Sequence, residues 1–322
     1  ESTGDKFLAE EIAAGSETAA IVREARKLRK HVGFLEKLDL HPRFMGTIKP
    51  NARSGRTTSD QENLQNLPRK TKPLIAVPDN RVLLAPDYAQ LELRTIACIT
   101  ADETMLRLFN EGEDLHDYSA RQMYGEDFTP TQRQIAKTFN FSLLYGAGAA
   151  TVRAMLLAQT GINLEEDEVT DLKRTWLKTF DGIKTWQGQG STRHNHGTDW
   201  HTPHGRYFKS ARYTDHLSIE NQGAGAEVAR LALHKMTEWL PPEALLCNFV
   251  HDSYLVECDN DPSIYKPVAA IMHKAMKYSW EAAPFAKHGV EMPVDVGVAH
   301  SWADADALKN CLYIYGDEDA QT

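Results

Sequence analysis

Residues 133–146, RQIAKTFNFSLLYG, combine cations and aromatic rings at helical spacing. Four of the side chains follow one another at i, i+4 steps: Arg133, Lys137, Phe141 and Tyr145. On an α-helix such residues lie along one face, each about 6 Å beyond the last. Cations neutralise phosphates and flat rings stack on bases, so this face is suited to a nucleoside triphosphate. An ordinary amphipathic helix with a solvated basic edge is the alternative that this stretch alone leaves open.

Two aspartates, Asp87 and Asp252, are the candidates for binding a metal. Each follows a short apolar run that is typical of a strand, so both side chains can stand at the rim of one sheet. Carboxylate oxygens suit Mg²⁺, and two such ions about 3.5–4 Å apart can activate an attacking 3′-hydroxyl and stabilise a leaving pyrophosphate. The alternative is that each aspartate is an ordinary turn residue.

Hydrophobic periodicity and breaker residues indicate which elements carry these side chains. Helical patterns cover 5–38, 103–125, the stretch that opens at Thr129 and Pro130 and ends at Gly146, 151–186, 225–239 and 265–280. Strand-like runs cover 81–85, 246–250, 254–257 and 292–298. We expect Pro86 to stop the first strand, the next two to form a hairpin, and the last to be the final strand. Few antiparallel strands and many helices predict an α+β fold.

Two long polar segments interrupt these patterns. Residues 41–74 are rich in Pro, Gly, Asn, Ser and Thr and are expected to be loop, and 188–216 is expected to be a hairpin or loop. The second segment holds four histidines without a cysteine among them, which is a weak signal for zinc: His194, His196, His201 and His204.

Composition places the chain among globular proteins without a membrane span. Of its residues 42% are hydrophobic and 25% charged, and no apolar run reaches the length of about 18 that crosses a bilayer. No signal-peptide pattern is present, so we expect a cytoplasmic location. The net charge of −9 argues mildly against nucleic acid, but residues 23–37 concentrate Lys and Arg, so a basic surface remains available. The chain begins without methionine, as a fragment of a longer protein would.

The four cysteines form no CxxC pair, which favours a reducing compartment and no disulfide framework. Cys247 and Cys258 flank the predicted hairpin and could face each other across it. We expect them to pack in the core.

Seven blocks, in order, resemble the sequence motifs of the polymerase portion of family A DNA polymerases. They are GRTTSDQENLQNLP at 55–68, DYAQLELR at 87–94, DLHDYSA at 114–120, RQIAKTFNFSLLYG at 133–146, TPHGRYF at 202–208, NQGAGAE at 221–227 and VHDSYLVE at 250–257. Three of these are similar to the family's motifs A, B and C, which begin here at Asp87, Arg133 and Val250. Order and spacing fit from about residue 5 to 302, so the resemblance is specific.

The resemblance implies a right-hand polymerase fold with an antiparallel-sheet palm, helical fingers and a mostly truncated thumb. Residues 1–50 would be the thumb base, 51–95 and 215–322 the palm, and 96–214 the fingers. The implied enzyme is a DNA-directed DNA polymerase of bacterial or phage type that adds deoxynucleotides to a primer 3′-hydroxyl and releases pyrophosphate. Its partners would be primer–template DNA and dNTPs, its cofactors two Mg²⁺ ions, replaceable by Mn²⁺, and it would act as a monomer.

The resemblance also implies a role for individual residues. Asp87, Asp252 and the backbone carbonyl of Tyr88 would bind the metals, and Lys137 would act as a general acid. The nucleotide would contact Arg133, Lys137, Phe141, Tyr145, Glu92, His116 and Gln90. The primer–template would contact Arg56, Asn63, Gln65, Gln222, His251 and Arg206. Arg94 would be a structural partner within motif A.

One departure from the family pattern lies in motif C, where Ser253 stands in place of the usual Glu. The resulting HDS triplet resembles motif C of single-subunit RNA polymerases, which share the right-hand fold. That reading fails elsewhere, because those enzymes lack the ELR run and the NLQNLP block. A catalytically weak relative that binds primer–template is the other alternative. No exonuclease carboxylate set is visible before residue 40, so we expect no proofreading.

Overall fold

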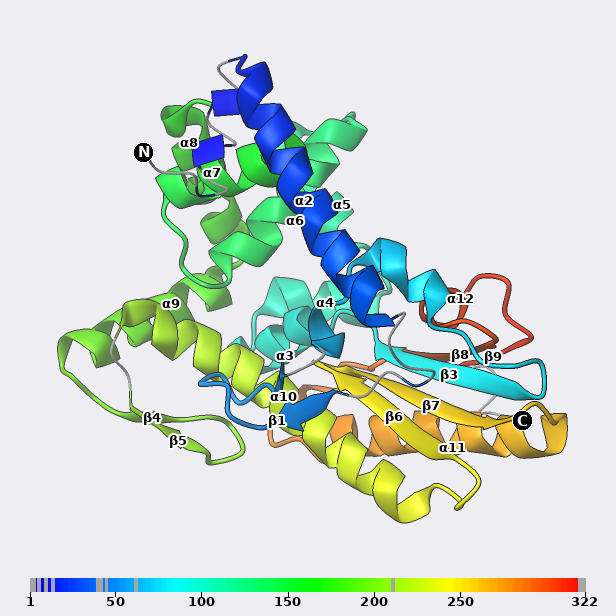
Figure 1. Cartoon of the computed structure of the whole chain (residues 1–322). Coiled ribbons are helices and arrows are strands. Elements are labelled where there is room, and N and C mark those ends of the chain that lie inside the picture. Colours follow the sequence, from blue (N-terminus) through cyan, green and yellow to red (C-terminus); the bar gives the residue numbers. More distant parts are fainter. Residues whose placement is uncertain are drawn as a thin grey trace. The chain divides into compact units, whose positions relative to one another are not determined.

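The computed structural model describes residues 4, 7–8, 11–12, 15–38, 43, 46–60, 63–209 and 212–317 (Figure 1). They form two compact units. The helical unit comprises Glu1–Val32, Ile96–Trp200 and Phe208–Ser218, and the sheet unit comprises Gly33–Thr95, His201–Tyr207 and Ile219–Thr322. The α+β class predicted from the sequence is confirmed. No helix among the described residues is both long and apolar enough to cross a membrane.

A five-stranded antiparallel sheet forms the centre of the sheet unit, in the order β6-β7-β3-β8-β9. Its strands are β3 (Arg81–Tyr88), β6 (Leu245–Val250), β7 (Ser253–Asp259), β8 (Val294–Ala299) and β9 (Tyr313–Tyr315). Helix α11 (Pro262–Glu281) lies along one face, and α12 (Trp302–Ala307) packs on β3 and β8 (Figure 1). The predicted hairpin is therefore present, whereas the expectation that 292–298 is the last strand was wrong, because β9 follows it.

Strand β3 continues through Pro86, so the prediction that this proline stops the strand was wrong. Among the described residues, β3 pairs with β7 over Arg81–Leu84 and with β8 over Leu83–Tyr88. Beyond Leu84 the β7 side of β3 is open, and a residue without an N–H is tolerated on such an edge. The sheet therefore splits where β3 carries Asp87.

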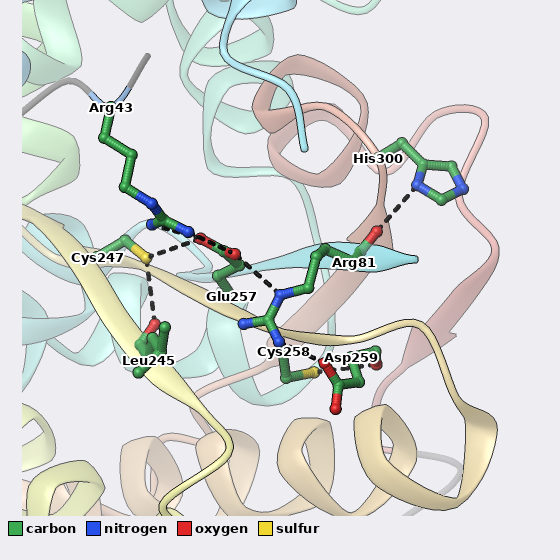
Figure 2. Close-up of polar contacts among 8 residues, drawn as sticks. All are labelled: Arg43, Arg81, Leu245, Cys247, Glu257, Cys258, Asp259 and His300. Carbon is green, nitrogen blue, oxygen red and sulfur yellow. Dashed lines mark hydrogen bonds and ion pairs between the residues drawn. The ribbon is translucent and has the colours of Figure 1, made fainter. Parts of the chain in front are cut away.

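An ion-pair cluster fixes the register of β3 against β7 at the opposite end of the strands. Arg81 Nε donates to Glu257 Oε1 at 2.9 Å, and its guanidinium also pairs with Asp259. Arg43 approaches the same Glu257 from the other side, with both contacts at 3.1 Å (Figure 2). A one-residue slip would break these pairs and turn every side chain of β3 to the other face.

The two hairpin cysteines do not face each other. The register of β6 against β7 shifts between Leu246 and Asn248, so Cys247 lies in a bulge, with its Sγ 3.9 Å from Glu257 Oε2 (Figure 2). Cys258 is buried in β7, as expected of a core residue, whereas Cys247 is exposed, and both are free thiols. The bulge was not visible in the sequence pattern.

Helices make up most of the helical unit. They are α4 (Glu103–Asn110), α5 (Leu115–Tyr124), α6 (Pro130–Leu143), α7 (Ala149–Thr160), α8 (Glu166–Thr179) and α9 (Asp181–Asn195). The helix predicted over 103–125 is broken, because Gly112 has a φ of +70° and Asp114 caps a new helix. Thr129 and Gln132 form a capping box at the start of α6, as the sequence predicted for Thr129.

Three helices have their residues divided between the two units: α2 (Glu17–Leu38), α3 (Leu91–Thr100) and α10 (Tyr213–Trp239). Helix α10 begins twelve residues before the predicted 225 and therefore includes Gln222. The hydrophobic pattern did not indicate its first turns because they are polar. Parts of the predicted helix at 5–38 and of the predicted loops at 41–74 and 188–216 lie outside the described residues. Within those loops are the strand pairs β1 (Thr47–Lys49) with β2 (Thr58–Asp60) and β4 (Trp200–His201) with β5 (Tyr207–Phe208), and the short helices η1 (Leu64–Asn66) and η2 (Arg69–Leu74). A further short helix, η3 (Ala286–His288), follows α11.

Gly297 allows α12 to lie directly on the sheet, and its replacement tests this packing. A Cβ at Gly297 would lie 2.2 Å from the backbone carbonyl oxygen of Ala305. We expect Gly297→Ala to lower the free energy of unfolding by about 2 kcal/mol or more, since backbone must move. Urea unfolding measures it, with Gly188→Ala as the control because a Cβ there meets nothing within 4 Å. Equal stability of Gly297→Ala and wild type would contradict the packing.

Candidate functional site

Asp87 and Asp252 lie at the same end of two neighbouring strands. Asp87 is the penultimate residue of β3, and Asp252 lies in the tight turn between β6 and β7. Because Leu84 pairs with Val256, continuing that antiparallel register brings Asp87 level with Ser253, the residue after Asp252. The sheet thus brings the two predicted metal ligands together, 165 positions apart in the sequence, at the point where β3 and β7 separate.

Burial and neighbouring carboxylates disfavour the charge of Asp87. Burial, the nearby Asp252 and then Asp306 raise the pKa of Asp87 to about 7, although its side chain still reaches solvent. Burial likewise raises the pKa of Asp252. Asp306, which the sequence reasoning missed, lies on α12 and lines a hollow of about 170 Å³ with Asp87. Its position depends on the packing of α12, so no local sequence signal could have indicated it.

The carboxylate pair fits a hard divalent cation. Its oxygen donors are those that Mg²⁺ takes, and a cation would compensate the repulsion that raises the pKa of Asp87. Within the part of the chain that the structure describes, no three His, Cys, Asp or Glu side chains cluster as metal ligands. Further ligands would therefore be carbonyl oxygens or water. The four histidines of residues 194–204 likewise form no such cluster among the described residues.

A small hollow beside Asp252 gathers four more of the predicted site residues. Arg56, Glu92, Gln222 and His251 line it together with Asp252. The guanidinium of Arg56 forms an ion pair with Glu92, and both side chains are partly buried. His251 has a φ of +58°, and burial followed by the charge of Arg56 lowers its pKa, which keeps its ring neutral near pH 7. Ser253 Oγ donates to the Val250 carbonyl at 3.2 Å and so closes the turn without adding charge.

Other residues predicted to contact primer–template bind to their own chain. Gln65 is buried and donates to Thr57 Oγ1 at 2.6 Å and to the Phe249 carbonyl at 2.9 Å. The Asn63 side chain caps η1, and the Arg206 guanidinium donates to Glu227 at 3.0 Å. These side chains hold the loops around the hollow.

Other residues of motif A are anchored around the predicted metal ligands. Tyr88 is buried and its hydroxyl donates to the Met276 carbonyl at 3.2 Å, which ties β3 to α11. Arg94 donates to the carbonyls of Ala89 at 3.0 Å and Glu291 at 2.6 Å, as expected of a structural partner. Gln90 is exposed with a φ of +54° at the turn into α3.

Helix α6 presents the predicted nucleotide-binding face in the helical unit. Arg133 is held by Asp114, at 2.9 Å, and by Asp117, whose hydrogen bond raises the pKa of the guanidinium. Lys137 is exposed, and Phe141 is 37% exposed. The expectation that Tyr145 continues this helix face was wrong, because α6 ends at Leu143. The backbone turns after Leu143, and Gly146 follows with a φ of +69°.

His116 lies behind this face as a neutral, positioned ring. It is 5% exposed, its ring centroid lies 5.7 Å from that of Phe141, and Nδ1 lies 2.8 Å from Asn140 Nδ2. Burial, which outweighs the opposing charge of Asp114, lowers its pKa, and Lys137 and Arg133 act in the same direction. Asn140 also accepts from Trp176 Nε1 at 2.6 Å and from Ser119 at 2.8 Å. The sequence reasoning missed this asparagine, because its partners come from separate helices.

Comparison with known proteins gives consistent matches. The model of DNA polymerase family A matches residues 1–304. DNA polymerase I of Aquifex aeolicus is 30% identical over 274 residues, which are 81% of this chain and 47% of that protein. DNA polymerase I of Deinococcus radiodurans is 29% identical over 294 residues, 82% of this chain and 28% of that protein. The chain thus spans half or less of the length of these relatives.

A solved structure shows the same fold. It is the POL domain of Pol1 from M. smegmatis, in complex with DNA primer-template and dNTP. The TM-score is 0.76 at 22% sequence identity, and the match covers 89% of this chain and 53% of that chain. The antiparallel sheet and its helices therefore have the arrangement of a polymerase domain.

Replacing Asp87 tests the cost of burying its charge beside Asp252. Because the folded pKa is raised from 3.8 to about 7, folding binds a proton between these pH values, and Asp87 costs stability increasingly as the pH rises through them. We expect the stability of Asp87→Asn relative to wild type to be about 1 kcal/mol greater at pH 8 than at pH 5 without divalent metal, a figure that allows for solvent screening. Thermal unfolding at both pH values measures this difference. Addition of Mg²⁺ at about 10 mM should stabilise wild type more than the variant.

A stability difference that is independent of pH would contradict this account. Asp79→Asn is the matched control, since Asp79 is an exposed aspartate at the other end of β3.

Proposed function

The chain belongs to DNA polymerase family A, and on this premise we propose that it carries out template-directed DNA synthesis. It would add deoxynucleotides to a primer 3′-hydroxyl, release pyrophosphate and act as a monomer on primer–template DNA. The observation that carries the proposal is the carboxylate pair, Asp87 and Asp252, at the split end of an antiparallel sheet. The names of the relatives and of the structural match support it.

The division of the chain into two compact units supports an assignment of palm and fingers. We assign 51–95 and 215–322 to the palm, 96–214 to the fingers and 1–50 to the base of a thumb. The sheet unit contains most of the assigned palm, and the helical unit contains most of the assigned fingers. The palm would hold the metals and the primer end, and the fingers would hold the incoming nucleotide.

Asp87, Asp252 and the backbone carbonyl of Tyr88 would hold two Mg²⁺ or Mn²⁺ ions, which when bound supply activation of the 3′-hydroxyl and charge stabilisation for the leaving pyrophosphate. The protein's own contribution is to position groups and neutralise charge. Lys137 would bind the β- and γ-phosphates and give a proton to the pyrophosphate oxygen, since it is exposed on α6. Arg133 would exchange Asp114 and Asp117 for the same phosphates.

Sugar and base contacts would come from both motifs A and B. Phe141 would pack on the sugar, with the neutral His116 ring beside it. Tyr145 would stand near the templating base, and Gln90 would contact the nucleotide. Glu92 would close the space beside the 2′ position and exclude ribonucleotides by steric contact, held in place by Arg56.

The primer end would be read in the hollow beside Asp252. Arg56 and Gln222 would donate to minor-groove acceptors, which all four base pairs offer, and so test the shape of the pair. His251 would contact the terminal phosphate of the primer. Asn63 and Gln65 would contribute to primer–template binding indirectly, because their side chains hold the loop in place.

Ser253 favours one second candidate, a catalytically weak relative that binds primer–template.

The proposal also includes the absence of proofreading by these 322 residues. Running the extension assay with rNTPs tests an RNA polymerase activity, and incubating an end-labelled primer without dNTPs tests for exonuclease. Binding of primer–template without extension would support the weak relative.

Primer extension with dNTPs tests the proposed function directly. We expect Mg²⁺-dependent elongation by wild type, and a loss of several powers of ten in rate for Asp87→Asn and for Asp252→Asn, because each removes charge from the metal site. Asp79→Asn is the control and should extend like wild type. Extension that survives either substitution, or that proceeds in EDTA, would refute the assignment.

Phe141→Tyr tests the contact with the sugar. The ring is 37% exposed, and the substitution adds only a para-hydroxyl to it. The phenol can replace the hydrogen bond of a missing 3′-hydroxyl, so we expect more incorporation of dideoxynucleotides relative to dNTPs. Termination measured on a sequencing template would show it, and equal termination by wild type and variant would count against the assignment. Phe139→Tyr would not test this contact, because the Phe139 side chain is fully buried.

A further inference from the structure

The guanidinium of Arg206 joins two segments that carry predicted primer contacts. Nη1 donates to the Arg53 carbonyl at 3.3 Å and Nη2 to the Ser54 carbonyl at 2.9 Å, while Nε donates to Glu227 Oε1 at 3.0 Å. The carbonyls belong to the loop that leads into Arg56, and Glu227 lies on α10. All three donor nitrogens are therefore used within the sheet unit, and the side chain is only 28% exposed.

Two glycines make room for this guanidinium. A Cβ at Gly55, where φ is +88°, would lie 2.8 Å from Nη2, and a Cβ at Gly223 would lie 2.7 Å from the same atom. Gly55 directly precedes Arg56, and Gly223 directly follows Gln222. The planar group therefore packs in a slot whose two walls each carry one residue of the hollow beside Asp252.

Glu227 is the fixed end of this arrangement. Its side chain is 8% exposed, and it also accepts from Thr202 Oγ1 at 2.9 Å, while His204 Nδ1 lies 3.0 Å from its other oxygen. Burial opposes its ionisation, but hydrogen bonds from His204, Thr202 and Arg206 outweigh burial and hold its pKa below the usual range. A charged, buried acceptor with several donors is rigid, because each donor restricts its rotation.

We propose that Arg206 is a positioning residue that sets the separation of Arg56 and Gln222, and that it does not itself contact DNA. Three acceptors in a fixed fork determine where the loop at 53–56 lies against α10. The inference rests on the proposed function, since it assumes that Arg56 and Gln222 read the primer end. It assigns a shared task to Gly55, Arg206, Gly223 and Glu227, which lie in three of the sequence blocks.

A direct phosphate contact by Arg206 is the competing account, and salt separates the two. Each phosphate neutralised adds about 0.9 to the slope of log affinity against log salt concentration for duplex DNA. A positioning residue leaves that slope unchanged and lowers the preference for a matched over a mismatched primer terminus. Fluorescence anisotropy with both primer–templates measures these quantities without requiring catalysis.

The decisive experiment places Arg206→Lys in two backgrounds. In wild type we expect it to reduce the matched-to-mismatched binding ratio and the single-nucleotide incorporation rate by about tenfold or more, because misplacement by about 1 Å is that costly. In Arg56→Ala/Gln222→Ala the same substitution should change neither quantity, since the residues it positions are gone. Arg230→Ala is the control: Arg230 Nη2 lies 3.9 Å from Glu227 Oε1, three residues along the same helix, and this variant should resemble wild type.

A second variant keeps the test independent of folding defects in Arg206→Lys. Gly223→Ala displaces the guanidinium from the opposite wall and should give the same losses with the same dependence on background. Equal losses in both backgrounds would overturn the proposal, and so would a salt slope reduced by about one in Arg206→Gln, which removes the charge that Arg206→Lys keeps. Failure of wild type to extend a primer would refute the proposed function, whereas the anisotropy measurements would still decide the role of Arg206.

Discussion

The burial of Asp87 and Asp252 next to each other is the constraint on which the rest of the site depends. Two carboxylates at one end of a sheet must take up a proton or a cation, and burial makes that requirement stronger. The fold maintains the proximity at the other end of the strands, where Arg81 connects Glu257 and Asp259. The packing of α12 on Gly297 adds Asp306 to the same region. The site is thus prepared for a cation by its own electrostatics.

Three arginines of the predicted site are held by carboxylates in a complementary way. Arg133 is paired with Asp114 and Asp117, Arg56 with Glu92, and Arg206 with Glu227. The first two are partly exposed pairs, whose guanidinium groups can turn to a phosphate or a base edge at small cost. The third is buried at Glu227 and bonded to backbone carbonyls, so it serves as a support. The partners, rather than the exposure of the arginine itself, therefore separate the arginines that would bind ligand from the one that would hold others in place, since Arg206 is 28% exposed and Arg56 30%.

Local patterns predicted much of this arrangement from the sequence. The hairpin around Asp252, the cap at Thr129 and the strand before Asp87 depend on neighbouring residues, and each is present. The errors depend on distant ones. Pro86 is tolerated within β3 because β7 has already diverged, and Tyr145 leaves the α6 face because the turn after Leu143 diverts the chain. Asp306, Asn140 and the partners of Arg206 became evident only when separate elements were brought together.

Binding of Mn²⁺ to the protein alone tests the central claim most directly, because it requires neither DNA nor nucleotide. Calorimetric titration of wild type at pH 8 should show binding that weakens by about tenfold for each pH unit below 7, since a proton on Asp87 must be released. Asp87→Asn and Asp252→Asn should each abolish that binding. Binding that is independent of pH, or equally strong in either variant, would contradict the account that the paired carboxylates form the metal site.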